Sequence, residues 1–147
     1  MPQRSSRLEG CRATGAIVAG LIAVFLCSPV ARAEGSNLGF GLGGRLSDYD
    51  GTVHQYNASG ERFRIRGRCQ SACTLFLAIK NVCIERSAQL RFHAGSSPIS
   101  TARMLGAYNG KLRNYLNAGN HMSSSAFHAI SGSDMISKFG YKECPSR

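Results

Sequence analysis

The stretch that decides the fold is ERFRIRGRCQSACTLFLAIK, residues 61–80. Within its first six residues, ERFRIR, polar and apolar side chains alternate from Arg62 to Arg66, which is typical of a β-strand with one buried face. We expect Phe63 and Ile65 to point from that face into the core. A tight turn at 67–71 follows, and the apolar run 72–80 predicts a helix of about two turns.

The other face of this strand consists of Arg62, Arg64 and Arg66. We interpret these arginines as the solvated face of an edge strand, where charged side chains discourage aggregation between strands. The alternative interpretation is a patch that binds an anionic partner.

The segments on both sides of this stretch predict an alternation of strands and helices. A glycine-rich loop covers 34–44, and Ser47 caps a helix that runs to about Asn57. Further along we expect two short strands, one long helix and two short helices, at 81–84, 88–93, 101–118, 124–130 and 133–139. Interleaved strands and helices favour the α/β class, with a small sheet flanked by helices.

Residues 1–33 contain the three parts of a secretory signal peptide in order. A start with three arginines is followed by the uncharged apolar run 14–27, and then by Ala31 and Ala33 at the small-residue positions that cleavage requires. We therefore expect cleavage after Ala33, a periplasmic or secreted product, and a single mature domain at 34–147. The alternative is an uncleaved N-terminal anchor, although the apolar run is shorter than the ~20 residues of a membrane span. The mature segment keeps 14 basic and 7 acidic residues, a net charge of +7.

Four cysteines remain in the predicted mature segment, Cys69, Cys73, Cys83 and Cys144. An even number of cysteines in an exported protein predicts two disulfides. Three pairings satisfy that prediction, and the sequence does not choose among them. A bridge from Cys144 would hold the C-terminal end in place. The alternative is a zinc site made by Cys69, Cys73, Cys83 and His93, although their spacing matches no familiar zinc module.

Ser71, His93 and the pair Gly43-Gly44 are candidates for a catalytic site. Ser71 stands between a predicted strand and a predicted helix, a position that exposes a nucleophile, although serine is also a favoured helix cap. His93 ends the apolar strand LRFH, where it is placed to accept the serine proton. Consecutive glycines let backbone N–H groups face a developing oxyanion, and the amide of Ala72 is a further donor.

The order of these motifs resembles a known family. It resembles the order in the Clp protease proteolytic subunit, within the Clp/crotonase superfamily. In this sequence that order is a Gly-Gly pair, a helix, a strand, GRCQSACT, a second helix and LRFH. The segment 43–94 is also similar to a group of small exported proteobacterial proteins. The resemblance implies a truncated Clp/crotonase-like fold in which Gly43 and Gly44 serve the oxyanion, Ser71 is the nucleophile and His93 is the base.

The third catalytic group of that family is an acid that orients the histidine and comes from a later segment. Asp134 is the one Asp or Glu between His93 and Lys142, and it is therefore the candidate. The alternatives are a Ser–His dyad and a Ser–Lys pair that uses Lys111, as in some membrane-associated relatives. The strands that precede the Gly-Gly loop in full-length relatives are not expected here, and a homo-oligomer would cover the sheet edge that this leaves bare.

Two functions from different classes fit these features. The first is an exported serine hydrolase, similar to a peptidase, that acts on a peptide substrate. The second is a non-catalytic envelope protein whose basic surface meets an anionic partner, such as a lipid head group or a cell-wall polymer. An exported chain without clustered basic and aromatic residues argues against nucleic-acid binding, and no motif requires a cofactor or a metal. His54, His121 and His128 are interpreted as surface or partly packed side chains.

Overall fold

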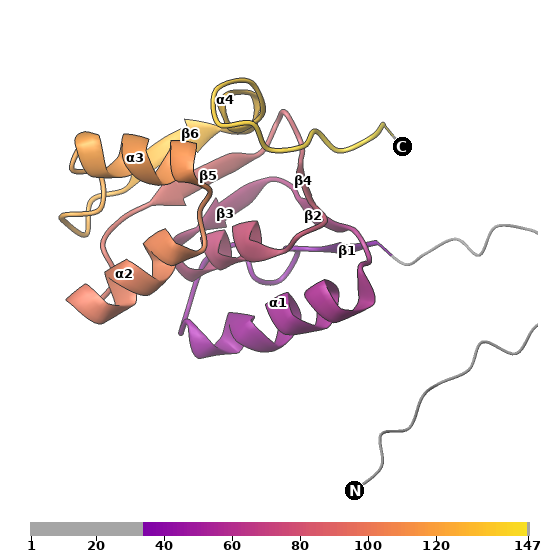
Figure 1. Cartoon of the computed structure of the whole chain (residues 1–147), viewed down its shortest axis with the longest axis horizontal. Helices are drawn as coiled ribbons and strands as arrows, with labels where there is room; N and C mark the ends of the chain where they lie inside the picture. The colour runs from indigo at the N-terminus through magenta and orange to yellow at the C-terminus, as the bar shows by residue number, and fades with distance from the viewer. Residues whose placement is uncertain (1–33, 147) are drawn as a thin grey trace, which may run out of the picture. The chain divides into compact units, whose positions relative to one another are not determined.

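Two small sheets carry the fold of residues 34–146, the part of the chain that the computed structural model describes (Figure 1). Their strands are β1 (Gly35–Ser36), β2 (Phe63–Ile65), β3 (Arg68–Gln70), β4 (Val82–Ile84), β5 (Gln89–Phe92) and β6 (His128–Ser131). The first sheet has the order β1-β2-β4, and its strands are parallel. In the second sheet β5 lies between β3, which is parallel to it, and β6, which is antiparallel.

From β2 to β5 the chain alternates between the two sheets, and a helical segment follows each of these two pairs of strands. The helical segments are α1 (Ser47–Ser59), the 3₁₀ helix η1 (Ser71–Ala78), α2 (Pro98–Gly106), α3 (Gly110–Ala118) and α4 (Gly132–Ser137). Thus β2 leads into β3 and then η1, and β4 leads into β5 and then α2. Figure 1 shows α1 and α2 below the strands and α4 above them. This arrangement belongs to the α/β class, as the sequence predicts.

The core is built around η1, which contacts α1, α2 and strands of both sheets. Its residues 72–77 are all buried, as the apolar run in the sequence predicts, although the hydrogen bonds have the tighter 3₁₀ spacing. Phe76 packs against Phe63 of β2 and Tyr49 of α1, with ring centroids 4.5 and 5.1 Å apart. The predicted helix at 47–57 is confirmed as α1, but Ser47 is its first residue and makes no capping hydrogen bond.

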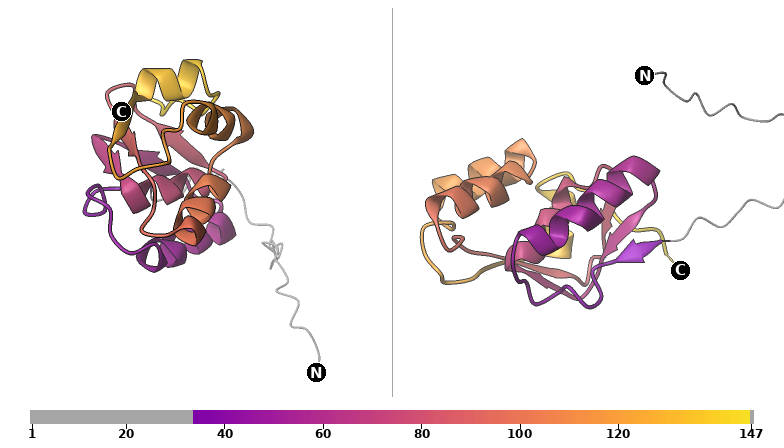
Figure 2. Two further views of the ribbon diagram at one scale, coloured as in Figure 1. Left: turned by 90° about the vertical axis from the view of Figure 1, so that its left-hand side faces the viewer. Right: turned by 90° about the horizontal axis from the view of Figure 1, so that it is seen from below.

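The solvated edge strand predicted for the arginines is wrong for Arg64. β2 is the central strand of its sheet, and the Arg64 side chain is only 4% exposed. Its guanidinium donates to both carboxylate oxygens of Glu34, to Glu85 and to the carbonyl of Pro145. These acceptors replace the water that a buried cation loses. The contacts also bring together the two ends of the described chain (Figure 2).

The predicted helix at 101–118 is two helices, because the chain breaks at 107–109. The Asn109 side chain accepts a hydrogen bond from the N–H of Leu112 and donates one to the carbonyl of Phe139. An asparagine N-cap of this kind begins a new helix, so the apolar stripe in the sequence spans α2 and α3. The break also places Tyr108 in the core, where its side chain is 2% exposed.

The short helix predicted at 124–130 is also wrong, because His128–Ser131 form β6. This strand pairs with every residue of β5, from Gln89 to Phe92. Pairing satisfies backbone groups that an open edge of β5 would leave exposed, and this outweighs the weak helical preference of a short segment. The helix predicted at 133–139 is confirmed in position as α4, and the Ser131 hydroxyl caps it by accepting from the N–H of Asp134.

The disulfides are Cys69–Cys73 and Cys83–Cys144, one of the three pairings left open by the sequence. The second joins β4 to the C-terminal segment, as expected for a bridge from Cys144. The zinc alternative is wrong, because the sulfur atoms it needs are bonded in disulfides. Two disulfides indicate an oxidising location outside the cytoplasm. The predicted signal peptide, with cleavage after Ala33, lies outside the described residues.

Candidate active site

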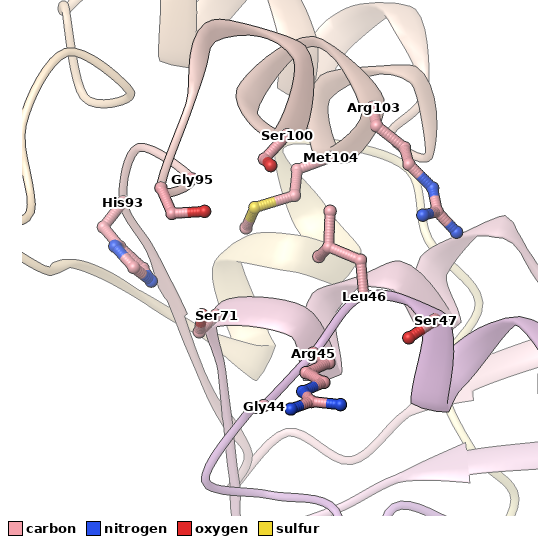
Figure 3. A pocket seen from close by; sticks show the side chains of 11 residues that line it. Gly44, Arg45, Leu46, Ser47, Ser71, His93, Gly95, Ser100, Arg103 and Met104 are labelled. Atoms are coloured by element: carbon pink, nitrogen blue, oxygen red, sulfur yellow. The ribbon is translucent and has the colours of Figure 1, made fainter.

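A pocket of about 570 Å³ contains both the predicted nucleophile and the predicted base (Figure 3). Ser71 lines it from the start of η1, and His93 lines it from the residue after β5. Leu46 and Met104 contribute apolar side chains from the start of α1 and from α2. The remaining lining residues are polar or small: Gly44, Arg45, Ser47, Gly95, Ser96, Ser100 and Arg103.

Ser71 has a backbone φ of +54°, in the left-handed region that residues with a Cβ rarely adopt. Such a conformation costs about 1–3 kcal/mol and persists only where the surrounding structure holds it. Here the Cys69–Cys73 disulfide spans the turn, and the Thr74 hydroxyl donates to the Ser71 carbonyl at 2.7 Å. A strained strand-to-helix turn is the geometry that exposes the nucleophilic serine in several hydrolases.

Gly43 is required for its small size rather than for its N–H group. A Cβ at this position would lie 2.7 Å from the Ser71 Cβ and 2.9 Å from the Gln70 carbonyl oxygen, and φ is +83°. The Gly43 N–H donates to the carbonyl of Phe40 at 3.2 Å, so it is used within the loop. The expected oxyanion role of Gly43 is therefore corrected to close packing against Ser71. The amides of Gly44 and Ala72 stay candidate donors.

His93 is partly buried, and neither ring nitrogen has a hydrogen-bond partner among residues 34–146. Burial lowers the pKa of His93 below its usual value of 6.5. The imidazole is therefore neutral at pH 7, which is the form that accepts a proton.

Phe127 is a neighbour of His93 that the sequence did not reveal. The two rings meet edge to face with centroids 4.7 Å apart, and the Arg91 guanidinium lies 4.8 Å from the Phe127 centroid. Phe127 thereby covers part of the His93 ring. Its segment precedes β6 and was predicted to be helical, so no local signal placed it near His93.

The structure does not bring Asp134 to His93. Asp134 lines a separate pocket of about 240 Å³ and pairs with Lys138 at 3.1 Å, one helical turn away. Lys111 is exposed on α3 and does not line the pocket that contains Ser71. Neither the expected acid nor the alternative lysine base is therefore assembled around Ser71 and His93.

His121, in the connection after α3, lies against His128, the first residue of β6. Their rings are stacked with centroids 3.5 Å apart, and the Tyr115 hydroxyl is 3.1 Å from His128 Nε2. Burial, and then the neighbouring His121, lower the pKa of His128. Both side chains are partly buried, and His54 is exposed on α1. These positions agree with the expectation of surface or partly packed histidines.

Within residues 34–146, none of the helices has the length and hydropathy that crossing a bilayer requires. Comparison of the sequence with protein-family models and with curated proteins gives no match.

Proposed function

We propose that this chain is an exported serine hydrolase of the peptidase type, with Ser71 as the nucleophile and His93 as the base. The observation that carries the proposal is the left-handed backbone of Ser71, at a strand-to-helix turn in the pocket that His93 also lines. We further propose a reduced Clp/crotonase-like fold. The alternation of β2, β3, β4 and β5 between two mainly parallel sheets supports that assignment.

In the proposed reaction, Ser71 Oγ attacks the carbonyl carbon of a peptide bond while its proton passes to His93. The amides of Gly44 and Ala72 donate to the resulting oxyanion. Collapse of this intermediate breaks the C–N bond, and His93 returns the proton to the leaving amine. Water then attacks the acyl-serine, with His93 accepting its proton and passing it to Ser71 Oγ as the acid product leaves.

The site would work as a Ser–His dyad, because no carboxylate bonds to His93 among residues 34–146. Removing the orienting carboxylate from a complete triad lowers kcat on the order of 10⁴-fold. We therefore expect slow turnover, and a reactive probe is a more sensitive test than a substrate.

The second candidate function is a non-catalytic envelope protein that binds an anionic partner through its basic surface. It is favoured by one observation, the absence of any hydrogen-bond partner for His93 among the described residues. On this alternative Ser71 only begins η1, and His93 has a packing role beside Phe127.

The test is labelling with a fluorophosphonate, in which an activated serine Oγ displaces fluoride from phosphorus. The oxidised protein is purified after expression of the full chain, and the modified residue is identified by mass spectrometry. We expect labelling at Ser71 that is lost in Ser71→Ala and strongly reduced in His93→Ala. The exposed Ser87 lies outside the pocket, so Ser87→Ala is the matched control and should label like the wild type.

Absence of labelling in folded wild-type protein would overturn the hydrolase proposal and favour the binding protein. The same purification tests export, because the mass of the exported product should correspond to a chain that begins at Glu34. The Glu34 carboxylate accepts two hydrogen bonds from the buried Arg64. The proposed cleavage would therefore keep this ion pair in the mature protein.

A further inference from the structure

The Ser71 carbonyl is anchored in the interior of the protein. The Thr74 hydroxyl donates to it at 2.7 Å, and Thr74 is fully buried. A threonine hydroxyl has one proton, so this bond leaves only acceptor capacity on Thr74 Oγ1.

The second partner of Thr74 must therefore be a donor. The Tyr108 hydroxyl lies 2.6 Å from Thr74 Oγ1, so Tyr108 donates to Thr74 and Thr74 donates to Ser71. Tyr108 is held between α2 and α3, where Phe92 packs edge to face against its ring at 5.3 Å. Burial raises the pKa of Tyr108 far above its usual value of 10, which keeps the phenol protonated.

The direction of the Ser71 carbonyl also sets the direction of the next N–H group. The described chain contains no cis peptide bond, and in a trans peptide the C=O and N–H groups point in opposite directions. Because the Ser71 carbonyl points to the buried Thr74 hydroxyl, the Ala72 N–H points the opposite way. That direction is away from the buried Thr74 hydroxyl, and Ser71, on the other side of this peptide bond, lines the pocket.

We propose that Thr74 and Tyr108 are positioning residues that orient the Ser71–Ala72 peptide, so that the Ala72 N–H faces the pocket as an oxyanion donor. The proposal rests on the proposed hydrolase function. It also explains what the break between α2 and α3 achieves, since this break places Tyr108 in the core against Thr74.

The test compares the rate of Ser71 labelling by the fluorophosphonate in the wild type and in three variants of the full chain. Thr74→Val removes the hydroxyl and keeps the shape, and we expect labelling to slow about tenfold or more, as when an oxyanion donor is misplaced. Tyr108→Phe leaves the Thr74 hydroxyl in place and should slow labelling less. Thr74→Ser restores the hydroxyl and should label at nearly the wild-type rate.

Tyr141→Phe is the matched control. Its hydroxyl accepts from the N–H of Asn109 at 3.1 Å, so the variant also removes a tertiary hydrogen bond beside Tyr108, but it removes neither of the two hydrogen bonds that join Tyr108 to Thr74 and Thr74 to Ser71. It should lower the melting temperature without slowing the labelling. A labelling rate in Thr74→Val no lower than in Tyr141→Phe would overturn the proposal. If Thr74→Val does not fold, the labelling rates of the other variants decide. Slower labelling in Tyr108→Phe than in Thr74→Ser and Tyr141→Phe supports the proposal, and a rate in Tyr108→Phe no lower than in Tyr141→Phe overturns it.

A second measurement separates this proposal from the hydrolase proposal. The Ala72 amide resonance, followed by NMR, should move in Thr74→Val and return toward its wild-type position in Thr74→Ser. If the wild type is never labelled, the hydrolase proposal fails, and the Ala72 resonance alone decides whether Thr74 orients the peptide. An unmoved Ala72 resonance in folded Thr74→Val overturns that orientation.

Discussion

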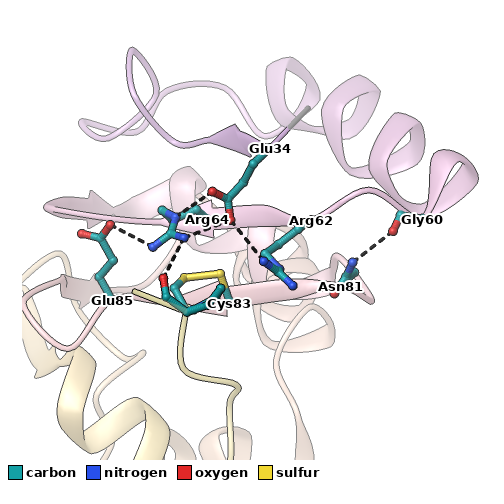
Figure 4. A network of polar contacts seen from close by, with 9 residues as sticks. Glu34, Gly60, Arg62, Arg64, Asn81, Cys83 and Glu85 are labelled. Atoms are coloured by element: carbon teal, nitrogen blue, oxygen red, sulfur yellow. Dashed lines mark hydrogen bonds and ion pairs between the residues drawn. A yellow bond between two sulfur atoms is a disulfide. The ribbon is translucent and has the colours of Figure 1, made fainter. Parts of the chain in front are cut away.

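Replacement of Arg64 by methionine should be among the most destabilising single substitutions in this protein. The guanidinium makes four hydrogen bonds, two of them to the Glu34 carboxylate, and its side chain is 4% exposed (Figure 4). Arg64→Met keeps much of the volume and removes the buried cation that Glu34 and Glu85 contact.

The magnitude follows from the exposure of those carboxylates. Removing one partner of a buried ion pair costs about 3–5 kcal/mol. The Glu34 and Glu85 side chains are 22% and 26% exposed, so water partly compensates them in the variant. We therefore expect the low end of that range, a loss of about 3 kcal/mol in the free energy of unfolding. For a domain of this size that loss lowers the melting temperature by about 10 °C or more.

The assay is urea denaturation of the oxidised protein at pH 7, followed by circular dichroism. Arg62→Met is the matched control, because Arg62 immediately precedes β2, is 46% exposed and approaches Glu34 only at 3.9 Å. That control should change the free energy of unfolding by less than about 0.5 kcal/mol. Equal effects of the two substitutions would refute the reasoning, because they would mean that burial of the guanidinium does not matter.

Three further predictions concern the disulfides, pH and the loop beside Ser71. The double variant Cys83→Ala/Cys144→Ala opens a loop with a sequence separation of 61 and should lose about 4 kcal/mol on the chain-entropy estimate, as measured by urea denaturation. Because burial lowers the pKa of His93, the unfolded chain binds more protons than the folded protein below pH 6.5, so the free energy of unfolding should fall as the pH drops through that range. Denaturation curves at pH 5 and 7 check this, and a pH dependence unchanged in His93→Gln would contradict it. Gly43→Ala forces a Cβ to within 2.7 Å of Ser71 at a left-handed φ, and it should abolish fluorophosphonate labelling of Ser71; normal labelling would show that the loop relaxes freely.

Features of this protein that depend on neighbouring residues could be predicted from the sequence. The alternation at Phe63 and Ile65 identified a strand, and the apolar run after Ser71 identified the central helix. The same local patterns placed Ser71 at a turn and His93 at the end of a strand, and the structure brings both into one pocket.

Other features depend on contacts between distant residues, and local patterns misjudged them. A strict alternation cannot distinguish an edge strand from a central one, so Arg64 was expected in solvent although Glu34, Glu85 and Pro145 surround it. The segment 124–130 has no strong preference for helix or strand. Its last residues, from His128, form β6 because they pair with the edge of β5. Asp134 is the candidate acid because it is the one Asp or Glu between His93 and Lys142, but the structure places it on α4, in a separate pocket and paired with Lys138.

By itself, the sequence determined the α/β class, the strand-to-helix turn at Ser71 and the even set of cysteines, because periodicity and turn chemistry act over a few residues. Only the tertiary structure decided which cysteines pair, why Gly43 must be small, and how Tyr108 reaches Ser71 through Thr74. These outcomes depend on which distant surfaces pack together. Packing and the pairing of buried polar groups are settled only when the whole core is assembled.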